Sequence, residues 1–316
     1  MSEREQYHQS VIGKGLTEED ERRILEEEKR FFDHPELSII SQNEREMTKI
    51  EQAIISLVLE AGDQIDEIYN APRFPIPPDN FHIIPGERWP EDLGSCSGIF
   101  NSHVQQIAIR ETPSRLHLAK LAFHELMHLK SFGKLQIVDD SKLVDSRAGF
   151  GIVSRDGKKE YFRLFEEAIV EVLTIDFINR HKGHELFAEE TKRTNELKER
   201  FGNDVIDNEG KAFFDDNLYY AEVLTNQDGS VKLDGQQFTY SKERLGLNLL
   251  IEKTVERDQL ERYNVSDLQA LFVRGHIDGN ILPIAKTIDS TFGEGVFRAI
   301  GSIEDPDELV SFIESL

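Results

Sequence analysis

One short run of residues in this 316-residue chain has the types and spacing of a metal site. His124-Glu125-Leu126-Met127-His128 is an H-E-x-x-H motif. Positions i and i+4 lie on one face of a helix, so both imidazoles can reach the same ion. Glu125 is offset by one position, where its carboxylate can hold water beside the metal without ligating it. The motif predicts His124 and His128 as ligands and Glu125 as a general base.

A hydrolytic zinc site needs a third protein ligand and an open position for water. In the H-E-x-x-H-x-x-G-x-x-H pattern, a glycine and a histidine would stand where this chain has Ser131 and Lys134. That subclass is therefore excluded. His181 and His184 lie far downstream, at the end of another expected helix, and are the weaker alternative.

Two glutamates form the stronger alternative. Glu167 and Glu171 are four residues apart, in a segment whose apolar neighbours predict a partly buried helix. One of the two can ligate the metal while the other accepts the outer N–H of a ligating imidazole, which sets the tautomer of that histidine.

The motif followed by Glu167-Ala168-Ile169-Val170-Glu171 resembles the gluzincin clan of zinc metallopeptidases, the thermolysin-like group. The resemblance covers residues 112–175 and indicates no subfamily. It implies zinc ligated by His124, His128 and Glu167, Glu125 as general base, and Glu171 as the carboxylate behind a ligand histidine. Glu166 stands where the clan usually has Asn, so Glu166 is a rival ligand.

The resemblance implies that metal-activated water hydrolyses a peptide bond, with a further side chain stabilising the oxyanion. The clan usually takes that group from a downstream Tyr or His, and the sequence does not choose among the candidates. They are Tyr161, Tyr219, Tyr220, Tyr240 and His276. His117, seven residues before His124, is more typical of a packed histidine than of a ligand.

Two other functions remain open from the sequence. One is a catalytically silent binding or regulatory protein that retains the zincin fold, and the other is a zinc hydrolase of a non-peptide amide. The presence of Glu125 favours catalysis, because a degenerate site would usually have lost it.

The sequence pattern also predicts the helices and strands that must position these residues. Thr112-Pro113 predicts the start of the motif helix, which Gly133 ends after about Phe132. A second helix is expected from Leu164 to Arg180. Ahead of the motif, 48–69 has helical periodicity, and Phe81–Ile84 and Val104–Arg110 resemble strands. We expect Gln106–Arg110 to be the sheet edge that binds an extended peptide. A hairpin is expected over 146–162, around Asp156-Gly157.

Three regions follow from composition. Residues 1–47 are expected to form a charged, mobile N-terminal arm with one solvated helix. Residues 48–185 are expected to form a zincin-like α+β catalytic domain, with a small mixed sheet over two active-site helices. Residues 186–316 are expected to form a mainly helical C-terminal domain with a hairpin near 225–235.

Charge and cysteine content exclude several classes of protein. Asp and Glu number 60 against 37 Lys and Arg, a net charge of −23, which disfavours nucleic acid and anionic membranes as partners. A peptide or protein substrate is expected instead, and the oligomeric state is not predicted.

The single cysteine, Cys96, excludes an internal disulfide and a four-cysteine zinc module, and its default is an inert loop thiol. With no apolar run of membrane-spanning length and no signal-peptide core, a cytoplasmic location is expected.

Overall fold

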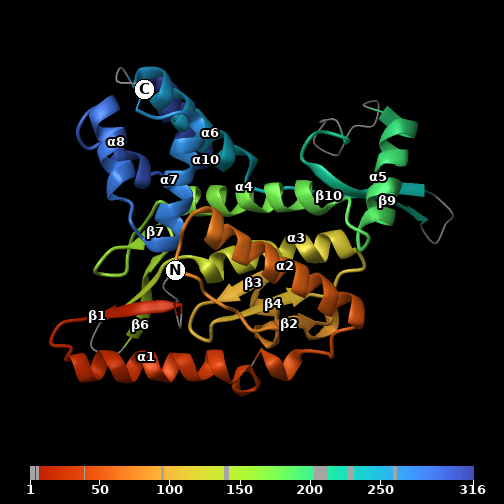
Figure 1. Ribbon diagram of the computed structural model, residues 1–316, viewed down its shortest axis with the longest axis horizontal. Helices are drawn as coiled ribbons and strands as arrows, with labels where there is room; N and C mark the ends of the chain where they lie inside the picture. Colours follow the sequence, from red (N-terminus) through yellow and green to blue (C-terminus); the bar gives the residue numbers. More distant parts are fainter. Residues whose placement is uncertain are drawn as a thin grey trace.

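The computed structural model describes residues 4, 7–38, 40–93, 96–138, 142–202, 213–225, 231–258 and 262–316. Within them the chain is an α+β protein of small mixed sheets and ten α-helices (Figure 1). The helices are α1 (Glu18–Asp33), α2 (Lys49–Ile68), α3 (Arg115–Lys130), α4 (Arg163–His181), α5 (Ala188–Phe201), α6 (Ser241–Arg257), α7 (Val265–Asp278), α8 (Leu282–Phe292), α9 (Val296–Gly301) and α10 (Pro306–Ser315). The strands are β1 (His8–Ile12), β2 (Phe81–Ile84), β3 (Gly98–Asn101), β4 (Gln106–Arg110), β5 (Gly133–Val138), β6 (Lys142–Ala148), β7 (Gly151–Val153), β8 (Glu160–Tyr161), β9 (Leu218–Thr225) and β10 (Val231–Gln237).

Helix α3 carries the H-E-x-x-H motif through the middle of the molecule. Its start is not at Thr112, as the sequence suggested: Ser114 is the N-cap, and its side chain accepts from the His117 backbone N–H. Glu190 of α5 accepts from the next two backbone N–H groups, those of Arg115 and Leu116. An acidic side chain from another helix therefore satisfies donors that the helix itself leaves open.

The core packs around α2, α3 and α4, which lie next to one another in Figure 1. The aromatic rings of Phe123 and Phe177 stack across α3 and α4 with centroids 4.2 Å apart. Most residues of α3 are buried, including Leu126 and Met127, which lie between the two histidines of the motif. This packing holds α3 against α4 and so keeps the motif next to the helix that carries Glu167 and Glu171.

The three-stranded sheet has the order β2-β4-β3. Strand β2 pairs with β4 in parallel, and β3 pairs with β4 antiparallel. The predicted strands at Phe81–Ile84 and Gln106–Arg110 are confirmed. The expectation that Gln106–Arg110 is the edge is wrong, because β3, which the sequence analysis did not find, covers that side.

The five-stranded sheet has the order β1-β5-β6-β7-β8. The expected hairpin is confirmed, since β7 and β8 pair antiparallel on either side of the turn at Asp156-Gly157. Strand β1 pairs in parallel with β5. The expectation of a mobile arm is therefore wrong for the described residues ahead of the predicted helix: His8–Ile12 form strand β1 of this sheet.

A second set of contacts anchors the N-terminal segment. The Arg4 guanidinium donates to the carbonyl oxygens of Lys130 and Ser131 at 2.9 and 2.8 Å, at the C-terminal end of α3. A cation at that end of a helix is favourable because unpaired carbonyls concentrate negative charge there. The chain's N-terminal region and the motif helix are thus directly joined.

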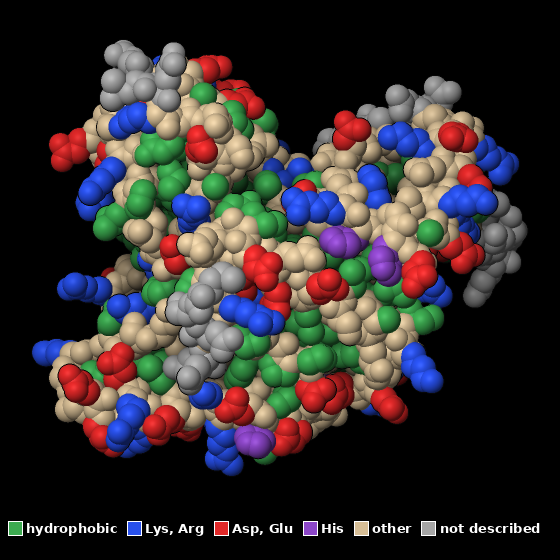
Figure 2. Space-filling view, in the orientation of Figure 1, with side chains coloured by type: hydrophobic (Ala, Val, Ile, Leu, Met, Phe, Trp, Pro, Cys, Tyr) green, Lys and Arg blue, Asp and Glu red, His purple; other side chains and the backbone are tan. Residues whose placement is uncertain are grey.

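Beyond α4 the chain is mainly helical, as expected, with an antiparallel hairpin of β9 and β10 whose tip lies outside the described residues. Helices α6–α10 and the α5–hairpin unit project on either side of a notch in the molecular surface (Figure 2). Among the described residues, no helix combines the length and apolar character needed to cross a membrane.

Candidate metal centre

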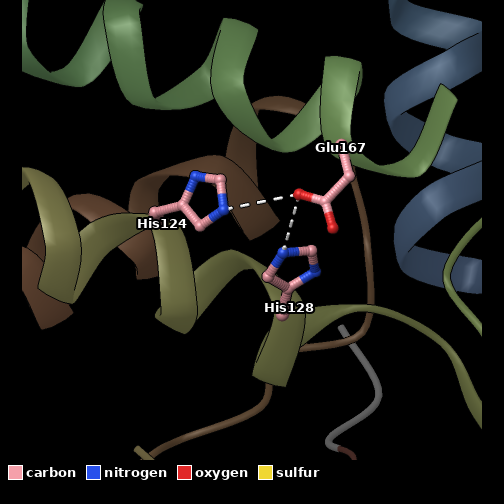
Figure 3. A group of neighbouring side chains, drawn as sticks. All are labelled: His124, His128 and Glu167. Atoms are coloured by element: carbon pink, nitrogen blue, oxygen red, sulfur yellow. Dashed lines mark ion pairs between the residues drawn. The ribbon is translucent and has the colours of Figure 1, made fainter. Parts of the chain in front are cut away.

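Three side chains from α3 and α4 converge on one point (Figure 3). The Nε2 atoms of His124 and His128 each lie 3.6 Å from the same carboxylate oxygen, Oε2 of Glu167. One donor atom from each residue lies within 4.8 Å of the other two. The structure thus brings together the three residues for which the sequence analysis expected a shared metal.

The outer nitrogen of each imidazole faces a different carboxylate. His124 Nδ1 lies 2.9 Å from Glu171 Oε2, and His128 Nδ1 lies 3.2 Å from Glu166 Oε1. An ionised carboxylate only accepts, so both rings donate from Nδ1 and keep the Nε2 lone pair for the convergence point. Glu166, the rival ligand, therefore lies behind His128, in the same relation that Glu171 has to His124.

Each of these outer carboxylates has a further basic partner. Lys120 Nζ lies 3.1 Å from Glu171 Oε2, and the Thr239 backbone N–H donates to Glu171 Oε1. His276 Nδ1 lies 2.9 Å from Glu166 Oε2, and its Nε2 lies 3.1 Å from the Met127 carbonyl oxygen. Both ring nitrogens of His276 therefore face an oxygen atom.

Gly149 makes room for the Glu166–His276 pair. Its φ is +55°, and an added Cβ would lie 2.2 Å from Glu166 Oε2 and 2.6 Å from His276 Nδ1. The backbone N–H of the next residue, Phe150, donates to the same Glu166 oxygen at 2.7 Å. A glycine is required here both for the left-handed backbone and for the close approach.

These contacts shift the pKa values of the cluster in opposite directions. Burial alone lowers the pKa of an imidazole, but the facing carboxylates outweigh it and raise the pKa of His124 and, well above its usual value, that of His128. Burial alone raises the pKa of a carboxyl group, but His276 and His128 lower that of Glu166 to about 2. His124 and Lys120 lower the pKa of Glu171 to about 2, and His128 and His124 lower that of Glu167. The carboxylates are ionised near neutral pH, so protons compete with a metal at the imidazoles.

Similarity to other proteins does not assign the site. Comparisons with protein-family models, curated proteins and solved structures give no match. The chemistry of the cluster must therefore be derived from its own atoms.

The donor set fits a divalent metal such as zinc. Glu167 Oε2 is buried, and it has no hydrogen-bond partner in the described part of the chain. The 3.6 Å separations are too long for hydrogen bonds but match ligand atoms around one tetrahedral ion, which are roughly 3.4 Å apart. Two imidazole nitrogens and one carboxylate oxygen are the donor types that catalytic zinc sites use, with a fourth position left open for water.

The cluster opens into a pocket of about 380 Å³, lined in part by His124, Glu125 and Glu167. Glu125 lies against the edge strand: a Cβ on Gly98 would be 2.9 Å from Glu125 Oε1. The absence of a side chain at Gly98 thus gives the Glu125 carboxylate its space. A second pocket of about 490 Å³ shares Arg163, Glu167 and Tyr240 with the first, so the cluster lies where two pockets meet.

Of the oxyanion candidates, the structure places Tyr240 in the pocket. Its ring stacks on His124 with centroids 5.9 Å apart, and its backbone has the left-handed φ of +55°. Burial and the nearby Glu167 raise its pKa, so the phenol keeps its proton. Tyr219 is buried and hydrogen-bonded to His117, which confirms His117 as a packed histidine.

The remaining candidates lie elsewhere. Tyr161 and Tyr220 are on β8 and β9 and do not line the pocket, and His276 is buried with both nitrogens bound. His181 and His184 are not in the cluster. Cys96 is exposed on the pocket lining.

Several residues around the site are not expected from the sequence. Lys120 lies behind Glu171, and Tyr7, Ser102 and Asp145 line the pocket. His276 is expected from the sequence only as an oxyanion candidate, whereas the structure places it behind Glu166. Lys120 could have been found, because it precedes His124 by one helical turn. The others come from distant segments, and no local pattern marks them.

Proposed function

We propose that this protein is a zinc-dependent metallopeptidase of the gluzincin type, with a zincin-like catalytic domain. The observation that carries the proposal is the convergence of His124, His128 and Glu167 on one open point, with an outer carboxylate fixing each imidazole. A zinc ion held there would supply an electrophile for the substrate carbonyl and would acidify water near it.

Side chains around the cluster take the other catalytic and positioning roles. Glu125, on the pocket lining beside the cluster, accepts the proton of the attacking water and delivers it to the leaving amine. The protonated Tyr240 phenol, next to His124, is placed to donate a hydrogen bond to the developing oxyanion. Glu166 and Glu171 hold the two imidazoles in the tautomer that ligation requires.

A peptide is favoured over a small amide by the shape of the site. Three residues of the edge strand β3, Gly98, Ile99 and Phe100, line the pocket. A partly exposed edge strand offers unpaired backbone groups to an extended peptide. The second pocket continues beyond Glu167 and gives the peptide room on the other side of the cluster.

Glu125→Gln tests the proposal, with Glu60→Gln on the exposed face of α2 as the matched control. Both variants and the parent protein are loaded with zinc, their metal content is measured, and a peptide library is digested and read by mass spectrometry. We expect full zinc in all three proteins and a loss of cleavage by about 10² to 10⁴ in Glu125→Gln only.

Two outcomes would count against a peptidase. Cleavage by Glu125→Gln at the parent rate would remove Glu125 as the general base. A zinc-loaded parent protein that cleaves no member of the library would favour the silent binding protein or the hydrolase of another amide.

A further inference from the structure

A second histidine cluster lies on the wall of the candidate active-site pocket. His8 of β1 is fully buried, and its two ring nitrogens face Glu28 Oε2 and Asp145 Oδ1, the latter at 2.6 Å. Ser102 Oγ donates to the other oxygen of Asp145 at 2.6 Å. We call His8, Glu28, Ser102 and Asp145 the His8 cluster.

The cluster presents a carboxylate to the pocket. Both partners of His8 are carboxylates, so the ring donates from both nitrogens as an imidazolium. His103 Nδ1 lies 3.7 Å from the other oxygen of Glu28, so Glu28 has two imidazole partners, whereas Asp145 is the acid of the cluster that lines the pocket. Asp145 is held by two hydrogen bonds, yet its side chain is 27% exposed and lines the pocket together with Ser102. Its remaining lone pairs are therefore available to a ligand.

An independent feature of the same wall points to a ligand. Tyr7 is fully buried, and its side chain lines the pocket with Asp145 and Ser102. Its hydroxyl oxygen makes no hydrogen bond of ordinary geometry among the described residues, and the Ser131 side chain is the polar group near it. The ring is held by Phe100, with centroids 4.9 Å apart, and lies close against Gly133. A buried polar atom without a partner costs free energy, so such an atom beside a pocket indicates a position completed by something else.

Resting on the proposed peptidase function, we infer that Tyr7, Ser102 and Asp145 form a subsite for a primary ammonium group of the substrate. An ammonium has three N–H donors and no acceptor. The wall offers it a carboxylate, a hydroxyl oxygen and a phenol oxygen, and the carboxylate supplies the charge. Arg163, the cation on the pocket lining, makes no ion pair with Asp145 within the described residues, so it does not neutralise this acceptor.

Two groups of a peptide have this chemistry, the α-amino terminus and the side chain of lysine. Three pools of hexapeptides with a C-terminal fluorophore separate them. The first has free N-termini and no lysine, the second is N-acetylated without lysine, and the third is N-acetylated with one lysine at varied positions. Binding to zinc-loaded Glu125→Gln protein is measured by fluorescence anisotropy, so that no turnover is needed.

The subsite predicts that the second pool binds at least about tenfold more weakly than the first or the third, because a charge-assisted hydrogen bond is lost. Binding of the first pool would identify the α-amino group and binding of the third the lysine side chain. Equal affinity of all three pools would overturn the inference.

Two substitutions test whether this wall of the pocket causes the preference for ammonium-bearing peptides. Tyr7→Phe removes only the hydroxyl and Asp145→Asn removes only the charge, and we expect each to reduce the preference for ammonium at least about threefold. The matched controls are Tyr263→Phe and Asp176→Asn, which lie outside the pocket. If Asp145→Asn does not fold, Tyr7→Phe decides alone. An unchanged preference in Tyr7→Phe would show that this wall is not the subsite.

The binding assay separates this inference from the proposed function. If the protein cleaves peptides but acetylation makes no difference to their binding, the subsite is wrong and the peptidase stands. If no peptide is cleaved but ammonium-bearing peptides are preferred and the variants lose that preference, the subsite stands and the peptidase fails.

Discussion

The candidate metal centre and the His8 cluster are built from the same types of side chain, histidine and acid, yet they leave their imidazoles in different states. In the metal centre, His124 and His128 each use one nitrogen on a carboxylate and turn the other toward a shared point. In the His8 cluster, one imidazole uses both nitrogens on carboxylates. The first arrangement keeps two lone pairs free for an ion, and the second has none to offer.

Proximity of histidine and acid therefore does not define a metal site. The two clusters differ in how many imidazole nitrogens are left without a carboxylate at hydrogen-bond distance. The i, i+4 spacing on α3 aims two imidazoles at one place, and α4 adds a third donor from across the core. His8 lies on a strand between two acids, where its proton, not a metal, offsets their charge.

The largest effect is expected from Glu167→Ala, which removes one of the three converging donors. Two imidazoles alone should not hold zinc at one equivalent, because a stable site needs a further protein ligand. Zinc content after dialysis measures the result, and His8→Gln is the control that should retain one equivalent. Full zinc in Glu167→Ala would contradict the assigned ligand set.

The next effect concerns the His8 cluster and stability. His8→Gln leaves Glu28 and Asp145 without their cation, which should lower the free energy of unfolding by about 3 to 5 kcal/mol. His34→Gln, at an exposed histidine, should change it by less than about 0.5 kcal/mol. Urea unfolding near pH 7 compares the two. Equal stability of both variants would mean that the buried imidazole does not offset the acids.

A smaller effect is expected behind the proposed zinc ligands. Glu171→Gln and Glu166→Gln keep His124, His128 and Glu167 but weaken the acceptor that orients each imidazole, so zinc affinity should fall about 10- to 100-fold. Glu171→Gln should lose more, because its oxygen lies 2.9 Å from His124 whereas that of Glu166 lies 3.2 Å from His128. Competition with a chromophoric chelator measures both, with Glu60→Gln as control. Affinities equal to the control would show that the outer carboxylates do not tune the site.

The two clusters also differ in how far the sequence could predict them. His124, His128 and Glu125 follow from spacing within one helix, and Glu167 with Glu171 follows from spacing within another. His8 and Asp145 are 137 residues apart and Glu166 and His276 are 110 apart, so no local period links them. The run of acids in α1 is typical of a solvated arm, and it hid the fact that Glu28 on the same helix faces a buried cation.

The prediction that Gln106–Arg110 lies at the sheet edge was wrong for a related reason. Gln106–Arg110 has the apolar alternation of a sheet strand, but whether a strand is central or at the edge depends on its neighbours. Strand β3, with a glycine at its start and partly exposed side chains throughout, carries little strand signal of its own. Its position is set by pairing with β4 and by the space that Gly98 leaves for Glu125.

The smallest effect, and the sharpest test of the comparison, is the pH dependence of the His8 contribution. Burial lowers the pKa of His8, but Asp145 and Glu28 outweigh it, so the pKa is raised above its usual value of 6.5. The stabilisation is fully present below about pH 6.5, the pKa of the unfolded chain, and is lost as the pH rises through the raised pKa of the folded state. The stability difference between the zinc-loaded parent and His8→Gln should therefore be constant just below pH 6.5 and shrink toward pH 9. Zinc bound at the candidate centre would keep His124 and His128 from titrating in both proteins, so the change reports on His8 together with His103, which lies 3.7 Å from Glu28. A difference that stays constant or grows from pH 6.5 to 9 would mean that His8 is not held as an imidazolium.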